Sequence, residues 1–197
     1  LGDGTTTPRY APVKVLGPGG VGFLSDVISI SASSDEWSST FYGRTCAATA
    51  SGAAYCWGYG GVGQLGNGGT SNSSTPVLVS GGHSFSKIMT TGGTYGSVCG
   101  VLTNGNTRCW GHSNSAATGH GIFGAGESSS STFSTPVQGP YTSNVVDLSV
   151  SSAPNEYYWL AQGYGAYYYG FGCAILSTGV VPRCWGYGAY GQLGDGT

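Results

Sequence analysis

The amino-acid sequence predicts an all-β protein made of about three repeated four-stranded units. Three copies of Cys-Trp-Gly, at residues 56–58, 109–111 and 184–186, each close a unit with the same internal order. The Pro-Val steps at Pro12, Pro76 and Pro136 are 64 and 60 residues apart, and each interval holds four short apolar-alternating runs. Turns rich in Gly and Ser separate these runs, and no helical periodicity is present. A pattern of this kind is typical of β-propeller blades, within a larger propeller or repeat array.

The four runs follow one another in a fixed order. A Pro-Val step comes first, an alternating run second (27–31, 87–90 and 145–150), a strand carrying one Cys third, and the Cys-Trp-Gly strand last. On this count blade 1 covers residues 1–64, blade 2 covers 65–121, blade 3 covers 122–192, and residues 193–197 begin the next repeat.

Composition excludes several classes of partner. Only 7% of the residues are charged and the formal net charge is −2, with six Lys and Arg scattered along the chain. No basic patch can therefore neutralise a row of phosphates, and we expect no nucleic acid partner. No apolar stretch reaches the roughly 18 to 20 residues of a membrane span. The first residues lack a signal-peptide pattern, so we expect a mature segment or part of a longer chain.

After two of the three Cys-Trp-Gly copies the chain carries a Gly-Gln-Leu-Gly turn, at residues 63–66 and 191–194. Together with the Cys-Trp-Gly hairpins and the Pro-Val strands, these turns resemble the repeats of the regulator of chromosome condensation family. The resemblance implies a β-propeller, seven-bladed in the best-known members, and says little about activity. The second unit departs from the family pattern after Trp110, where only a weak similarity to the turn is found, near residues 122–124.

The six cysteines fall into three local pairs, which spacing alone would also allow as metal ligands. Hairpin geometry favours disulfides. A three-residue loop at 50–52 sets Cys46 opposite Cys56, and the same loop at 103–105 sets Cys99 opposite Cys109. A four-residue loop at 177–180 sets Cys173 opposite Cys184. Directly opposed cysteines lie within disulfide reach, and three such bonds predict an extracellular protein, secreted or at the cell surface.

No pattern in the sequence supports catalysis. Residues 61–66 match the dinucleotide fingerprint but no helix follows them, so we interpret them as a turn. His83, His112 and His120 have no familiar metal-ligand spacing, and no Ser or Cys lies in a nucleophile elbow. The adjacent carboxylates Asp35 and Glu36 point apart on an extended chain. We therefore expect a protein that is not an enzyme, with no catalytic residue, no metal and no cofactor.

Two kinds of surface feature are candidates for modification or binding. Asn72 begins an Asn-Ser-Ser sequon and is a glycosylation candidate. Aromatic residues gather before the Cys strands of the first and third units: Trp37, Phe41, Tyr42, Tyr157, Tyr158, Trp159, Tyr164, Tyr167, Tyr168 and Tyr169. They could fold back over their own propeller, or form a contact surface for another protein or for sugar rings.

The sequence Leu-Gly-Asp-Gly-Thr stands at both 1–5 and 193–197, so the chain opens and closes at one phase of the repeat. Three blades are too few to close an ordinary propeller, and we expect further repeats or head-to-tail self-association. The leading hypothesis is a non-enzymatic unit of an extracellular fibre or surface layer. The alternative is a secreted binding propeller, inhibitor-like or lectin-like, which presents its aromatic loops to another extracellular protein or to glycans.

Overall fold

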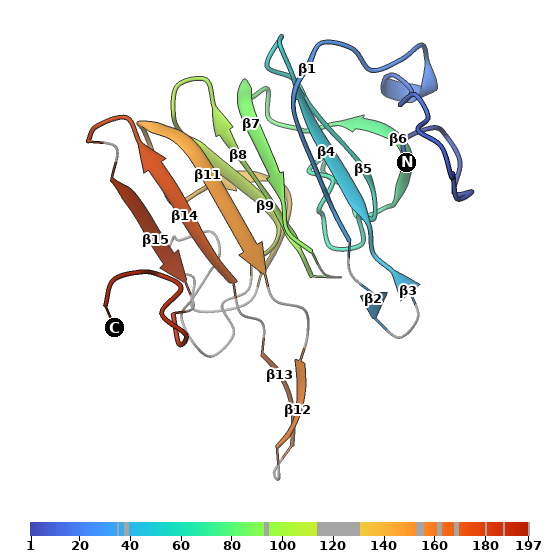
Figure 1. Ribbon diagram of the computed structural model, residues 1–197. Coiled ribbons are helices and arrows are strands. Elements are labelled where there is room, and N and C mark those ends of the chain that lie inside the picture. Colours follow the sequence, from blue (N-terminus) through green and yellow to red (C-terminus); the bar gives the residue numbers. More distant parts are fainter. Residues whose placement is uncertain are drawn as a thin grey trace.

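Three antiparallel sheets stand side by side in the computed structural model (Figure 1). The structure describes residues 1–34, 36–37, 40–92, 95–113, 131–152, 156–160, 163–167, 170–179, 181–186 and 188–196. The first sheet has the order β1 (Val27–Ser33), β4 (Arg44–Thr49), β5 (Ala54–Gly58), β6 (Ser73–Leu78). The second has the order β7 (Phe85–Thr90), β8 (Ser97–Leu102), β9 (Thr107–Ser113), β10 (Ser131–Gln138). The third comprises β11 (Val145–Ser152), β14 (Gly170–Leu176) and β15 (Pro182–Gly186).

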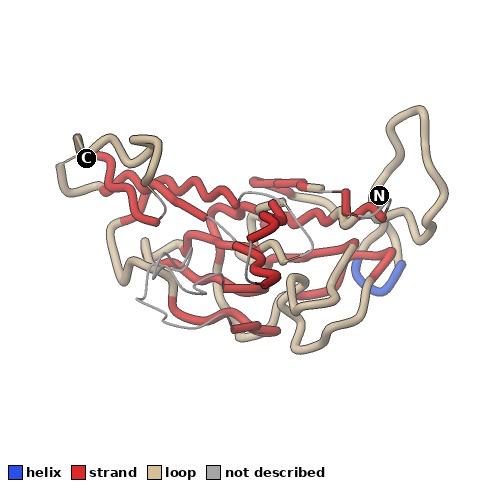
Figure 2. Tube along the Cα trace, turned by 90° about the horizontal axis from the view of Figure 1, so that it is seen from below, coloured by secondary structure: helices blue, strands red, loops and turns tan. Residues whose placement is uncertain are grey.

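This architecture confirms the predicted fold class of β-propeller blades. The one helical segment among the described residues is the short 3-10 turn η1 (Pro18–Gly20). No helix in the described ranges has the length and apolar character needed to cross a bilayer. Seen from below, the sheets form a row with the two chain termini at opposite ends (Figure 2).

The aromatic segments before the Cys strands form small hairpins outside the sheets. β2 (Glu36–Trp37) pairs with β3 (Thr40–Phe41), between β1 and β4 in the chain. β12 (Glu156–Leu160) pairs with β13 (Gly163–Tyr167), and this hairpin projects from the third sheet (Figure 1).

In chain order, each Pro-Val strand is the last strand of its sheet, whereas the repeat pattern predicts that it is the first. Val77 of β6 pairs with Cys56 of β5, and Val137 of β10 pairs with Cys109 of β9. The first sheet therefore runs from residue 27 to 78 and the second from 85 to 138, one strand out of phase with units counted from the Pro-Val step. An edge position suits proline, which has no N–H to donate to a further strand. The first Pro-Val step, at Pro12, lies in no strand of these sheets.

Hairpin registers match the loop counts made on the sequence. Cys46 pairs with Cys56, Cys99 with Cys109 and Cys173 with Cys184, at S–S distances of 2.13, 2.11 and 2.08 Å. Gly52 and Gly105 adopt φ values of +87° and +79°, which the three-residue loops require. The three disulfides thus occupy equivalent positions in successive sheets.

Candidate assembly interface

Each sheet presents two different faces. The disulfide face carries the Cys pair, and the tryptophan face carries the Trp of Cys-Trp-Gly, because neighbouring residues of a strand point to opposite sides. In the first sheet–sheet interface, the disulfide face of the first sheet packs on the tryptophan face of the second. This core includes Cys46, Ala48, Ala54, Cys56 and Val77 on one side and Phe85, Ile88, Val98, Leu102 and Trp110 on the other.

The second interface repeats this arrangement. The disulfide face of the second sheet supplies Met89, Cys99, Val101, Cys109 and Val137, and the tryptophan face of the third supplies Val145, Leu148, Ala174, Leu176 and Trp185. Strand registers make Leu148 the counterpart of Ile88, since Ile88 pairs with Gly100 and Leu148 with Ala174. One packing solution is therefore used twice within the chain.

Hydroxyl groups of β1 bind the backbone of β7 across the first interface. Ser29 Oγ accepts a hydrogen bond from Ile88 N at 3.1 Å, and Ser31 Oγ accepts one from Thr90 N at 3.0 Å. Ser33 Oγ donates to Thr91 O at 2.7 Å. These bonds satisfy backbone groups that an edge strand would otherwise leave unpaired.

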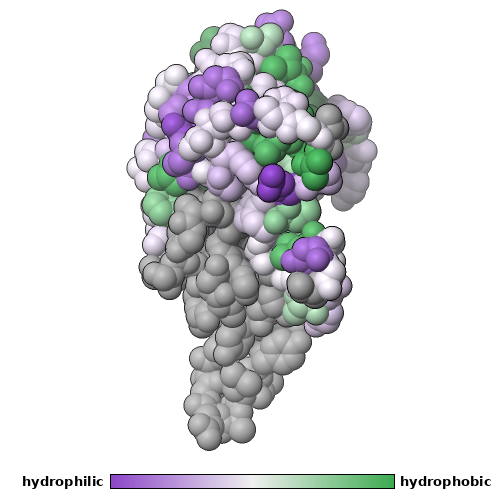
Figure 3. All heavy atoms as spheres, turned by 90° about the vertical axis from the view of Figure 1, so that its left-hand side faces the viewer, coloured by the Kyte–Doolittle hydropathy of each residue, from purple (hydrophilic) through white to green (hydrophobic). Residues whose placement is uncertain are grey.

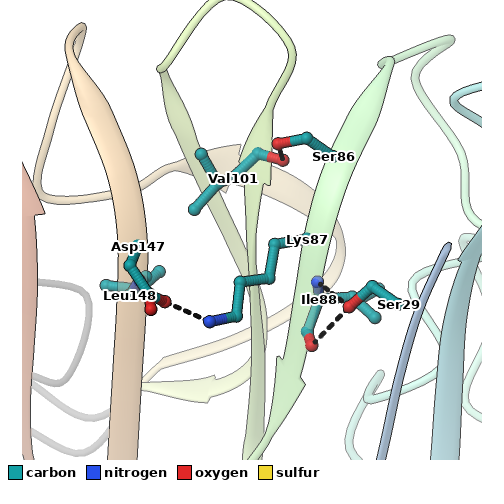
Figure 4. Close-up of polar contacts among 7 residues, drawn as sticks. All are labelled: Ser29, Ser86, Lys87, Ile88, Val101, Asp147 and Leu148. Carbon is teal, nitrogen blue, oxygen red and sulfur yellow. Dashed lines mark hydrogen bonds and ion pairs between the residues drawn. The ribbon is translucent and has the colours of Figure 1, made fainter. Parts of the chain in front are cut away.

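An ion pair replaces the hydroxyls in the second interface. Lys87 of β7 donates to the carboxylate of Asp147 on β11, which also accepts the Leu148 N–H at 2.7 Å (Figure 4). The hydrogen bond from Lys87 lowers the pKa of Asp147. Both side chains are more than a third exposed, so the pair positions the strands more than it stabilises them.

A Gly-Gln-Leu-Gly turn completes the first interface. Trp110 Nε1 donates to Gln64 O at 2.9 Å, and Gln64 is fully buried. Gln64 Oε1 accepts from Val62 N at 2.8 Å, which shapes the turn. Gly66 has a φ of +68°, and a Cβ there would lie 2.6 Å from Trp110 Nε1, so only glycine fits. The turn between β5 and β6 of the first sheet thereby supplies the hydrogen-bond acceptor for the Trp of the second.

One face of each kind has no sheet packed on it among the described residues. On the tryptophan face of the first sheet, Ile30 is 61% exposed, whereas its counterparts Ile88 and Leu148 are 1% and 2% exposed. On the disulfide face of the third sheet, Ile175 is 37% exposed, whereas its counterpart Val101 is 2% exposed. These two faces lie at opposite ends of the row (Figure 1), and Figure 3 shows apolar side chains among polar ones at the third-sheet end.

The aromatic candidates separate into two groups. Phe41 is 73% exposed and lines a cavity of about 670 Å³ together with Tyr59, Arg9 and Asn72. The rings of Tyr42 and Tyr59 meet edge to face at 4.8 Å, and burial raises the pKa of Tyr59. The structure therefore brings part of the first aromatic segment beside the glycosylation candidate.

The second group lies on the projecting hairpin. Tyr157, Tyr158 and Trp159 belong to β12, and Tyr164 and Tyr167 belong to β13, with Trp159 opposite Tyr164. This places them on a hairpin that extends away from the sheets, as Trp37 is placed on β2. Tyr168 and Tyr169 lie outside the described residues.

The polar candidates are dispersed. Asn72 is exposed, and its Oδ1 accepts from Gly60 N at 2.9 Å. Arg9 and Thr5 bind the carboxylate of Asp3 and hold its pKa at about 2. Within the described part of the chain, no three His, Cys, Asp or Glu side chains gather as metal ligands would, while His120 and Asp35 lie outside it.

Comparison with known families bears on the segment that forms the first interface. Residues 51–99 match the family model described as the regulator of chromosome condensation (RCC1) repeat. The chain contains an RCC1 repeat. That repeat runs from the first hairpin loop through β5, the Gly-Gln-Leu-Gly turn, β6 and β7 to Cys99. It therefore includes strands from both sheets of the first interface.

Solved structures with RCC1-like folds are also similar to this chain. Human WBSCR16 is 20% identical over 74% of this chain and 31% of its own, with a TM-score of 0.49. Yeast RCC1 (Prp20), solved bound to Kap60, is 24% identical over 77% of this chain and 31% of its own, with a TM-score of 0.49. Prp20p from Saccharomyces cerevisiae, described with its binding to Gsp1p and histones, is 22% identical over 78% and 32%, with a TM-score of 0.49. The chain spans about a third of the length of these proteins.

The sequence alone does not identify the residues that make the two ends of the row a candidate interface. Ile30 and Ile175 follow the same alternation as their buried counterparts, and nothing in that alternation shows which face is covered. The sequence does single out Gln64 as a residue of interest, because its Gly-Gln-Leu-Gly turn recurs at 191–194.

Proposed function

We propose that this protein is a non-enzymatic, extracellular assembly unit whose RCC1-like sheets stack head to tail. In the proposed contact, the disulfide face of the third sheet packs on the tryptophan face of the first sheet of the next unit. That unit is a second copy or a further repeat of the same chain. One observation carries the proposal: each end of the row exposes one partner of a face pair that is already packed twice inside the chain.

The Pro-Val periodicity supports this contact. The third sheet pairs β15 only with β14 among the described residues, whereas β5 and β9 each have a Pro-Val strand on their second side. Pro12 stands at the same phase of the repeat, outside any strand. We propose that this segment supplies the fourth strand beside β15 of the neighbouring unit, a form of strand addition.

Energetics favours a contact that uses the whole face. Covering a side chain such as Ile30 contributes on the order of 1–2 kcal/mol, whereas association itself costs at least about 4 kcal/mol. Several apolar residues and the backbone bonds of an added strand must therefore act together. Such a contact does not close on itself, so repeated stacking produces a fibre or a layer. Three disulfides support an oxidising, extracellular setting.

Placing a lysine on either exposed face tests the stacking contact. We expect Ile30→Lys and Ile175→Lys each to abolish concentration-dependent self-association in sedimentation velocity, because each buries a charge in an apolar interface. A mixture of the two variants should form dimers only, since each keeps one intact face. Val21→Lys, at a position that is 79% exposed directly after η1 and lies in no strand, is the matched control and should associate like the original chain. A compact monomer of about 20 kDa at every concentration would contradict stacking between copies.

A second candidate function, a binding propeller for glycans or an extracellular protein, is supported by the cavity beside Phe41. An exposed aromatic ring next to hydroxyl, amide and guanidinium groups suits a sugar ring. Binding on a glycan array should fall at least tenfold in Phe41→Ala and be unchanged in Phe23→Ala, which alters an exposed ring outside that cavity. Equal binding by both variants would contradict a glycan-binding site at Phe41. The residues of the β12–β13 hairpin, Tyr157 and Trp159 first, form a second set to substitute.

A further inference from the structure

Tyr42 and Tyr59 form a pair of touching phenol rings at one end of the first Cys hairpin. Their ring centroids lie 4.8 Å apart with an interplanar angle of 77°, so the edge of one ring rests on the face of the other. Tyr42 precedes β4 and Tyr59 follows β5. Because Tyr59 N donates to Gly43 O at 2.8 Å, the pairing of the two strands continues beyond their last ladder pair at Gly58. Backbone hydrogen bonds therefore bring the two side chains together.

The pair is held in place and remains open to solvent. The Cys46–Cys56 disulfide joins the two strands within the same hairpin. A Cβ on Gly61 would lie only 2.2 Å from Tyr59 Oη, so the glycine leaves the space that this hydroxyl occupies. Tyr42 and Tyr59 are both half-buried, so part of each residue stays accessible. The hairpin thus offers an oxidant two phenols in fixed contact.

Two further rings stand at the equivalent place in the second sheet. Tyr95 and His112 flank the second Cys hairpin as the two tyrosines flank the first, and their ring centroids lie 5.1 Å apart. The second sheet thus has an imidazole where the first has a second phenol. Burial, followed by the phenols of Tyr42 and Tyr95, raises the pKa of Tyr59. Tyr59 therefore keeps its hydroxyl proton at neutral pH, and its oxidation removes that proton together with an electron.

We propose that Tyr42 and Tyr59 form an oxidative cross-linking site, at which a haem peroxidase and hydrogen peroxide join the two rings through a carbon–carbon bond. Each phenol gives up one electron and its hydroxyl proton and becomes a phenoxyl radical. The two radicals couple at the carbons ortho to their oxygens, and the hydrogen on each of these carbons moves to the oxygen, which restores both aromatic rings. Peroxide takes up the two electrons and two protons and leaves as two water molecules. The chain therefore loses two hydrogen atoms in all.

The cross-link does not depend on the stacking proposed above, and it adds a second covalent tie to the first hairpin. It joins the segment that carries β2 and β3 to the turn after β5, outside the Cys46–Cys56 disulfide. Thiols break disulfides by exchange but leave a carbon–carbon bond intact. The first hairpin would therefore stay closed in a reducing medium, whereas the Cys99–Cys109 hairpin would open.

Peptide mapping after oxidation provides the test. Dilute protein is treated with a haem peroxidase and hydrogen peroxide, reduced, and digested with trypsin. Cleavage after Lys and Arg leaves Tyr42 as the one tyrosine of residues 15–44, Tyr55 and Tyr59 in residues 45–87, and Tyr95 as the one tyrosine of residues 88–108. We expect dityrosine fluorescence in the monomer, and a cross-linked peptide that joins 15–44 to 45–87 and lacks two hydrogens. Tyr42→Phe and Tyr59→Phe should each remove this peptide.

Two controls separate a positioned pair from general tyrosine oxidation. Tyr55→Phe removes a half-buried tyrosine of the same hairpin and should leave the cross-linked peptide unchanged. Oxidation of the reduced chain in urea should lower its yield at least about tenfold, because only the folded chain holds the two rings in contact. A cross-link from 45–87 to 88–108 in place of 15–44 would overturn the assignment to Tyr42. Coupling only between separate chains, or an equal yield in urea, would overturn the site altogether.

Discussion

Replacing Trp110 by Ala is expected to lower the free energy of unfolding by about 4 kcal/mol. The indole is fully buried between the first and second sheets, where it meets the Phe85 ring edge to face at 5.7 Å. Its removal leaves a cavity at the centre of the first interface and deprives Gln64 O of a donor. Urea denaturation followed by near-ultraviolet circular dichroism measures the change.

Two variants divide that loss into packing and hydrogen bonding. Trp110→Phe keeps much of the ring and removes the N–H, so it should cost less than Trp110→Ala. Trp185→Ala removes a half-buried indole from the second interface and should also cost less. A loss below about 1 kcal/mol for Trp110→Ala would contradict the assignment of Trp110 to the centre of the core.

Replacing both Cys99 and Cys109 by Ala is expected to cost about 3 kcal/mol. The bond closes a short hairpin loop, and its loss restores conformational freedom to the unfolded chain. Both residues are also fully buried in the second interface, so the shorter side chains leave a small void. Urea midpoints of the oxidised chain and the double variant, measured in parallel, give the difference.

The third disulfide is the matched comparison. Cys173 and Cys184 close a loop of nearly equal length but are only half-buried, so their replacement should lose the loop-closure contribution without the packing contribution. The second pair should therefore be the more costly to remove. The reverse order would show that the disulfide face of the third sheet is packed in solution as tightly as that of the second.

The sequence predicted the hairpins well because their geometry is local. Loop length and a left-handed glycine such as Gly52 decide which residues face each other, and both can be read from adjacent residues. The blade pattern was equally accessible, since the repeat of Cys-Trp-Gly and Pro-Val fixes the number and order of strands.

The pairing of sheets and of distant residues could not be predicted in this way. A periodic sequence has no natural starting point, so it does not show whether Pro76 opens one sheet or closes another. The bond between Gln64 and Trp110 joins residues 46 positions apart, and only the stacking of two sheets brings them together. Exposure of Ile30 likewise depends on a neighbour, because β1 and β7 alternate alike in the sequence and differ only in what covers them.

The serine hydroxyls of β1 have a consequence for how such sheets can evolve. Ser29 and Ser33 bind main-chain atoms of Ile88 and Thr91, so these two bonds place no demand on the identity of the side chains there. The Lys87–Asp147 ion pair differs, because each side chain depends on the charge of the other. A substitution of one therefore requires a matching substitution of the other. A chain of this kind can therefore diversify at one boundary while the other keeps its particular partner.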